Sequence, residues 1–154
     1  MEVTTTLAAL AFVVNLFVQT PVLAHNNPGN LVKSNSHWVG EVHKQGRFTA
    51  FKSSHYGLRA LCIVLLRYEQ RHKIRTVEQL VNRFAPKHEN NHRKYVNFLC
   101  KKLGVTKRQK ISISKVMPIL VPAIIQYEHS RMPYNKAQIQ LAILDAKHYT
   151  SKHK

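Results

Sequence analysis

The division of charge along this chain is the feature that most constrains its fold. Residues 1–24 contain no Lys or Arg, whereas residues 25–154 contain all 24 of them against six acids, a formal charge of +18. The two segments are suited to different surroundings, because exposing apolar groups to water is unfavourable whereas charged groups need water around them. A chain of 154 residues is long enough for one domain with a modest core. We therefore expect a single domain at residues 25–150, preceded by an attachment segment.

Two interpretations of the attachment segment remain open. Residues 7–24 are mostly apolar, and Val22-Leu-Ala24 is similar to a signal-peptidase site, but Glu2 stands where a signal peptide has Lys or Arg. As a membrane span, the same segment has about the minimum length, with polar residues and a proline inside it. Because the sequence begins at Met1, we favour an uncleaved hydrophobic helix that anchors the protein to a membrane. The basic residues that follow favour a domain on the cytoplasmic or interior side.

The basic composition also limits the partners that this protein can have. The whole chain carries a formal charge of +17, and such a surface binds polyanions, including nucleic acid, anionic lipid and the acidic polymers of a bacterial wall. The ten His residues lack the spacing of a zinc site, and the sequence has no Gly-rich phosphate loop and no nucleophile elbow. Cys62 and Cys100 fall on apolar helix faces, which predicts buried thiols. We expect neither a metal nor a cofactor.

Hydrophobic periodicity predicts an α-rich α+β domain with one small β-hairpin. Residues 38–43 and 47–51 flank Lys44-Gln-Gly46, which predicts the hairpin. Apolar residues at helical spacing, with capping and breaking residues between them, predict a series of helices. Their expected ranges are Ser54 to about Arg71, Thr76 to Pro86, Asn90 or Asn91 to Gly104, Ser114 to Glu128, and about Asn135 to Lys147. Residues 148–154 are expected to form a basic, mobile tail.

Glu128 directly follows an apolar stripe and is the leading candidate for a catalytic acid. The stripe has the spacing of a buried helix face and consists of Val116, Ile119, Leu120, Ala123, Ile124 and Tyr127. Pro118 and Pro122 should kink this helix or split it. A carboxylate at the helix end meets the negative end of the helix dipole and an apolar wall, and both raise its pKa, as a general acid requires. The alternative is a solvated Glu128 neutralised by Arg131.

A series of short motifs gives the sequence a resemblance to a known family. The motifs are, in order, Asn26-Asn-Pro-Gly-Asn30, Trp38-x-Gly40, Gly46-Arg-Phe48, Phe51, Gly57-Leu-Arg-Ala60, Tyr68, Thr76, Asn82-Arg-Phe-Ala-Pro86, Glu89-Asn90, Tyr95, Leu103-Gly-Val105 and Ala123-Ile-Ile-x-x-Glu128. Over about residues 26–135 they resemble a family of phage virion proteins and related bacterial proteins with a lysozyme-like or lytic-transglycosylase-like domain. The sequence departs from that family at Phe84, where the family has Trp, and at Glu128-His-Ser130, where it commonly has Glu-Asn-Gly. The family's usual acid before Gly57 is also absent here.

The resemblance implies a lysozyme-like helical domain that cleaves peptidoglycan in the manner of a lytic transglycosylase or muramidase. A transglycosylase needs one essential carboxylate, whereas a two-carboxylate hydrolase needs a second acid about 5–9 Å away. The single-carboxylate mechanism is easier to build from a chain with seven acids. Glu128 resembles the catalytic Glu of these enzymes, and Glu89 is the alternative acid. The candidate substrate-binding residues are Asn27, Tyr134 and Asn90.

Two functions from different classes are consistent with these residues and with the resemblance. The first is a membrane-anchored, virion-associated enzyme that cuts peptidoglycan glycan strands during phage entry. The second is a non-enzymatic, membrane-associated structural virion protein that binds the genome or the capsid through its basic domain. The first function requires Glu128 to lie in a groove of sugar size, and the second expects a closed groove with the charge gathered on one flat face. A soluble nucleic-acid-binding module is a more distant third, because no recognition motif supports it.

Overall fold

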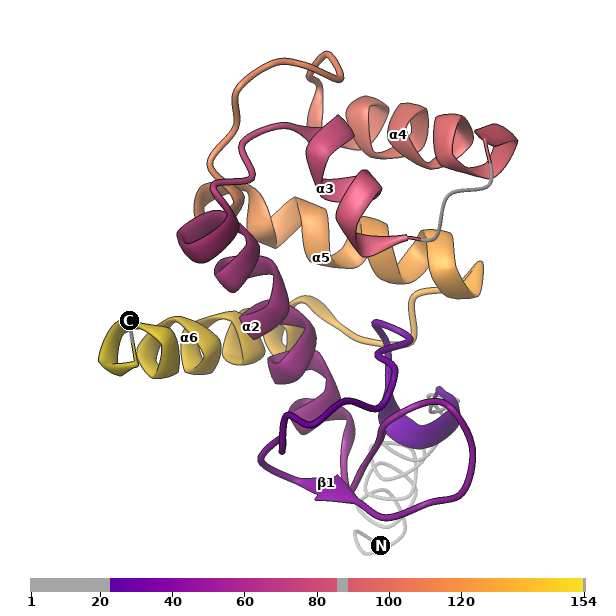
Figure 1. Ribbon diagram of the computed structural model, residues 1–154, viewed down its shortest axis with the longest axis vertical. Coiled ribbons are helices and arrows are strands. Elements are labelled where there is room, and N and C mark those ends of the chain that lie inside the picture. The colour runs from indigo at the N-terminus through magenta and orange to yellow at the C-terminus, as the bar shows by residue number, and fades with distance from the viewer. Residues whose placement is uncertain (1–22, 86–88, 154) are drawn as a thin grey trace, which may run out of the picture.

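The computed structural model describes residues 23–85 and 89–153, with only the backbone at residues 89 and 90 (Figure 1). The expected attachment segment at residues 1–24 lies almost entirely outside these ranges. Within them, no helix combines the length and the apolar content that a bilayer span requires.

Helices make up most of the described chain, which confirms the expected α-rich α+β class. The elements are the 3-10 helix η1 (Ala24–Asn26), β1 (Glu41–Val42), β2 (Ala50–Phe51), α2 (Ser54–His72), α3 (Val77–Phe84), α4 (Glu89–Leu103), α5 (Ile113–His129) and α6 (Lys136–Lys152). The predicted hairpin is also confirmed, because β1 and β2 pair antiparallel with Glu41 opposite Phe51.

Helix α2 is central to the fold. It packs along α6 and against α5, while α4 contacts both α5 and α3 (Figure 1). The core therefore surrounds α2 and receives side chains from α3, α4, α5 and α6. Its largest fully buried side chains are Leu58, Leu61, Ile63, Leu65, Leu66, Leu80, Leu99, Ile113, Met117, Leu120, Ile124 and Ile125. Removing such apolar surface from water is the main favourable contribution to folding.

The turn at residues 24–30 is fixed against the start of α2 by a close backbone approach. A Cβ atom at Gly57 would lie 1.8 Å from the carbonyl oxygen of Asn26, so only glycine fits there. The side-chain amide of Asn26 also donates to the carbonyl of Phe51 at 2.9 Å. This part of the resemblance motif therefore has a structural role, since it holds the turn in one place beside α2 and β2.

Helix α5 differs from the expectation in two respects. It runs as one helix through Pro118 and Pro122, so of the two expected outcomes, a kink or a split, the split does not occur. Ile119, which the stripe places on the buried face, is 53% exposed, whereas Val121 and Ile125 are fully buried. The physical reason is that α5 is apolar on nearly every side and contacts α2, α4 and α6. Periodicity alone cannot identify the solvent side of such a helix.

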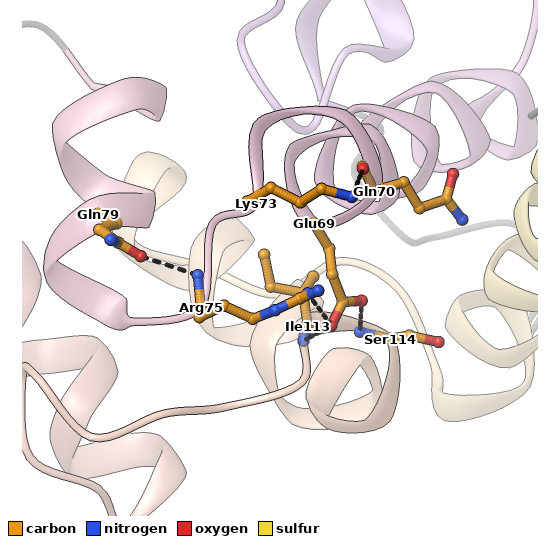
Figure 2. A network of polar contacts seen from close by, with 7 residues as sticks. All are labelled: Glu69, Gln70, Lys73, Arg75, Gln79, Ile113 and Ser114. Atoms are coloured by element: carbon orange, nitrogen blue, oxygen red, sulfur yellow. Dashed lines mark hydrogen bonds and ion pairs between the residues drawn. The ribbon is translucent and has the colours of Figure 1, made fainter.

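The start of α5 is held by a carboxylate from α2 (Figure 2). Glu69 accepts hydrogen bonds from the backbone amides of Ile113 at 3.1 Å and Ser114 at 2.9 Å. Its carboxylate also lies 3.1 Å from the guanidinium of Arg75. The side chain of Ser112 does not cap this helix, so Glu69 satisfies amides that would otherwise lack partners and places a negative charge at the positive end of the helix dipole.

Helix α6 is longer than the sequence predicts. Its capping box at Asn135 and Gln138 sets the expected start. The helix then continues to Lys152 instead of ending at about Lys147, so most of the expected mobile tail is helical. Thr150 is buried, and the guanidinium of Arg59 lies 4.8 Å from the ring centroid of Tyr149. These contacts with α2 hold a segment that its basic composition alone would leave in solvent.

Candidate functional site

A groove of about 810 Å³ lies where the turn at residues 29–32 meets α4 and the end of α5. This volume is within the range of about 300–1,000 Å³ that is typical of ligand sites. Tyrosine, phenylalanine and histidine side chains contribute to its lining, together with two arginines. The residues that line it are Gly29, Asn30, Leu31, Val32, Arg47, Phe48, Tyr68, Arg83, Phe84, Ala85, Asn91, His92, Tyr95, Tyr127 and Glu128.

Glu128 lies in this groove, at the end of α5, and is partly buried. Its carboxylate accepts a hydrogen bond of 3.1 Å from the side-chain amide of Asn30. Among the described residues Glu128 forms no ion pair, so the expected alternative of neutralisation by Arg131 does not occur. The neighbouring His129 contacts the carbonyl of Pro28 at 2.9 Å through Nε2. The turn and the end of α5 are thereby joined, and Glu128 is held at the groove wall.

Two side chains from α4 face the same groove. His92 and Tyr95 are three residues apart and therefore lie on one side of the helix. The Nε2 atom of His92 and the hydroxyl oxygen of Tyr95 are buried, and neither has a hydrogen-bond partner among the described residues. Such atoms are costly to bury unpaired.

Tyr95 is also coupled to Glu128 electrostatically. Its ring is stacked on that of Tyr127, with centroids 3.8 Å apart and planes 8° from parallel. Burial raises the pKa of Tyr95, and the nearby carboxylate of Glu128 raises that pKa further. The Tyr95 hydroxyl therefore keeps its proton over the whole physiological pH range and retains the capacity to donate a hydrogen bond.

Two of the three expected substrate-binding residues, Asn27 and Tyr134, do not line the groove around Glu128. Asn27 is buried, and its amide donates at 2.9 Å to the carbonyls of Leu31 and Thr49. It therefore holds the turn and does not line the groove. Tyr134 is buried between α5 and α6, where it lines a separate hollow of about 220 Å³.

Glu89, the alternative acid, and Asn90 start α4, and their side chains lie outside the described atoms. Their roles as acid and as substrate-binding residue stay predictions. Asn91 and His92, which follow them, do line the groove.

The sequence identifies Glu128 as a candidate but does not identify most of the residues around it. Asn30 belongs to the motif at residues 26–30, but only the path of the turn shows that it contacts Glu128 while Asn27 does not. Tyr95 is buried in the core and also lines the groove. The spacing of His92 and Tyr95 on one helix face is the signal that could have paired them.

The described residues thus define a small α-rich domain with a partly buried carboxylate in an open, aromatic groove. No protein-family model matches the chain. It is similar to Protein P5 of Pseudoalteromonas phage PM2, with 29% identity over 123 residues that cover 77% of this chain and 76% of that protein. This similarity supports the phage part of the resemblance found in the sequence.

Proposed function

We propose that this protein is a virion-associated enzyme that cleaves the glycan strands of peptidoglycan during phage entry. The observation that carries the proposal is the position of Glu128 in a groove of about 810 Å³, beside the hydroxyl of Tyr95 and the amide of Asn30. A general acid must lie where it can reach the leaving oxygen of a bound sugar chain. The similarity to a phage protein supports the virion context.

The lining of the groove favours the single-carboxylate mechanism. Among the side chains that the structure describes there, Glu128 is the one carboxylate. In the proposed reaction Glu128 donates its proton to the glycosidic oxygen and the bond to the anomeric carbon breaks. The sugar's own hydroxyl then attacks that carbon and gives its proton to the Glu128 carboxylate. The products are a free hydroxyl end and an anhydro end, and no water is consumed.

The charged and aromatic groups have matching roles in the proposed complex. Tyr68, Phe48 and Tyr127 offer flat apolar surfaces on which sugar rings stack. Arg47 and Arg83 lie in the lining where they are suited to the carboxylates of a wall polymer. The lysozyme-like fold and the membrane association implied by the sequence belong to this proposal.

The test is digestion of purified peptidoglycan by the full chain and three variants, followed by analysis of the products for anhydro ends. We expect Glu128→Gln to lower the rate at least about 10²-fold, because general acid–base catalysis typically contributes about 10²–10⁴-fold. Glu78→Gln is the matched control, since Glu78 lies on α3 outside the groove. Glu89→Gln tests the alternative acid. If Glu128→Gln retained full activity while Glu89→Gln lost it, the assignment of the acid would be wrong.

A second candidate is a non-enzymatic virion protein that binds genomic nucleic acid, a lipid membrane or other virion proteins. The formal charge of +17 favours this function. The same digestion separates the two candidates. A folded, unmodified chain that releases no product from peptidoglycan, but that binds duplex DNA or isolated capsids, would support the structural role.

A further inference from the structure

A second, smaller hollow lies on another part of the molecule, between the loop at residues 36–39, the middle of α2 and the end of α6. Its volume is about 240 Å³, and it shares no lining residue with the groove around Glu128. Two arginines from one face of α2 enter it, eight residues apart. We call it the arginine hollow, and the residues that line it are Ser36, His37, Trp38, Val39, Arg59, Ile63, Arg67 and Tyr149.

Arg59 is held rigidly at this hollow. Its side chain is only 10% exposed, and its Nε atom lies 3.1 Å from Oδ2 of Asp145. His55 contacts the same carboxylate oxygen at 2.9 Å. Burial works to raise the pKa of Asp145, but the hydrogen bonds and charges of His55 and Arg59 outweigh it and hold that pKa below its usual range. The contact of this ion pair with Asp145 is made through Nε, on one edge of the Arg59 guanidinium.

Arg67 has no acidic partner in the described part of the chain. Its guanidinium lies 5.7 Å from the ring centroid of Trp38 and 6.0 Å from that of Tyr149. The Tyr149 ring is also the one that Arg59 contacts at 4.8 Å. Two guanidinium groups are therefore gathered around one ring. Asp145 pairs with Arg59, and the carboxylate of Glu41 accepts a hydrogen bond of 3.0 Å from the backbone amide of Trp38, which also lines the hollow. Like charges this close repel one another, and a bound anion would relieve the repulsion.

We propose that the arginine hollow binds a phosphate group presented by an anionic lipid headgroup. Arginine is suited to phosphate because its planar guanidinium donates paired hydrogen bonds to oxygen atoms. The volume of about 240 Å³ admits one phosphate group with a small substituent. Trp38 and Tyr149 are the residue types that favour the interface between lipid and water, and Val39 on the rim is 55% exposed. This inference does not depend on Glu128 or on cleavage of peptidoglycan.

Trp38 allows a direct test, because it is the one tryptophan of the chain and lies in the hollow. The full chain is titrated with glycerol phosphate while Trp38 fluorescence is recorded, and potassium chloride of equal ionic strength serves as the blank. We expect a saturable change with glycerol phosphate and none with chloride. Arg67→Ala should weaken the binding at least about tenfold, because a charge-assisted hydrogen bond is lost. Arg67→Lys, which keeps the charge but not the planar group, should be intermediate.

Arg93→Ala is the matched control, since it removes the same charge from an exposed position on α4. It should change the affinity by less than about twofold, because an exposed charge at a distance is screened by salt. Equal losses in Arg67→Ala and Arg93→Ala would show that only general charge matters and would overturn the proposal. A response to chloride as large as that to glycerol phosphate would do the same.

A titration with vesicles of phosphatidylglycerol tests whether the phosphate belongs to a lipid headgroup. A change in Trp38 fluorescence that depends on Arg67 and is reduced by glycerol phosphate would support a lipid headgroup. A response to glycerol phosphate but not to vesicles would support the phosphate site while assigning it to a soluble ester. An Arg67-dependent response to duplex DNA alone would overturn the proposal in favour of nucleic acid.

Discussion

At the scale of single residues, Tyr95 combines a structural and a chemical role. Its ring is stacked on that of Tyr127 and contributes to the wall of the groove, while its hydroxyl is buried without a partner among the described residues. A buried hydroxyl without a hydrogen bond lowers the stability of the folded state. Unfavourable arrangements of this kind persist at functional sites, where a ligand supplies the missing contact.

Tyr95→Phe should therefore separate stability from activity. Removing the unpaired hydroxyl is expected to leave the free energy of unfolding unchanged or to raise it by about 1 kcal/mol. The rate of peptidoglycan cleavage should fall about tenfold or more, since Glu128 loses a neighbouring donor and the substrate loses a contact. Denaturant titration and the digestion assay measure the two quantities. Loss of stability together with unchanged cleavage would mean that the hydroxyl serves only the fold.

At the scale of elements, α5 is fixed at both ends by residues distant in sequence. Glu69 of α2 binds the first amides of the helix, as Figure 2 shows. At the other end of α5, Glu128 accepts a hydrogen bond from Asn30, and His129 contacts the carbonyl of Pro28. Both contacts join this end to the turn at residues 24–30. The position of Glu128 depends on these contacts, because a helix rotates or shifts as a unit when one end is released.

Glu69→Gln should weaken the hydrogen bonds that hold the start of α5. Glutamine has one acceptor oxygen where glutamate has two, so one of the two hydrogen bonds from the backbone amides is weakened. The charge that pairs with Arg75, whose side chain is 45% exposed, is also lost. We expect the free energy of unfolding to fall by about 1–3 kcal/mol, as is usual for losing hydrogen bonds to a charged group. Urea denaturation measures it. Glu78→Gln, which changes an acid at the surface of α3, should have a clearly smaller effect; an equal effect would contradict the capping role of Glu69.

At the scale of the whole molecule, the formal charge of +17 attracts polyanions over a longer range than contacts in the groove or the arginine hollow can. Ion pairs within the described chain use few of the basic residues, so most of that charge faces solvent. Such a field attracts any polyanion and accelerates its approach. The groove and the arginine hollow would then select among the molecules that this general attraction brings close.

General polyanion binding should depend steeply on salt and hardly at all on sequence. If the surface contacts six or more phosphates, the affinity for duplex DNA should fall by about 10³-fold between about 50 and 200 mM salt. Fluorescence anisotropy with two duplexes of unrelated sequence measures both properties. A preference above about tenfold for one duplex would contradict this expectation and indicate base-specific recognition.

The sequence by itself determines those features that depend on neighbouring residues. The hairpin, the order of the helices and the capping residues Thr76 and Asn135 are all predictable, because each depends on residues within about one turn. The position of Glu128 at the end of its helix is predictable for the same reason, through the stripe before it and Pro133 after it. The short motifs give the resemblance to phage virion proteins, and the similarity to Protein P5 of phage PM2 supports the phage part of it.

Only the tertiary structure decided which side chains meet. Glu69 and Ile113 are 44 residues apart, and Asn30 and Glu128 are 98 residues apart, so no local pattern could pair them. The exposure of Ile119, the full length of α6 and the buried role of Asn27 depend on contacts made after the elements pack. Local periodicity fixes which residues share a face of a helix. The direction in which that face points is set by the packing of the whole chain.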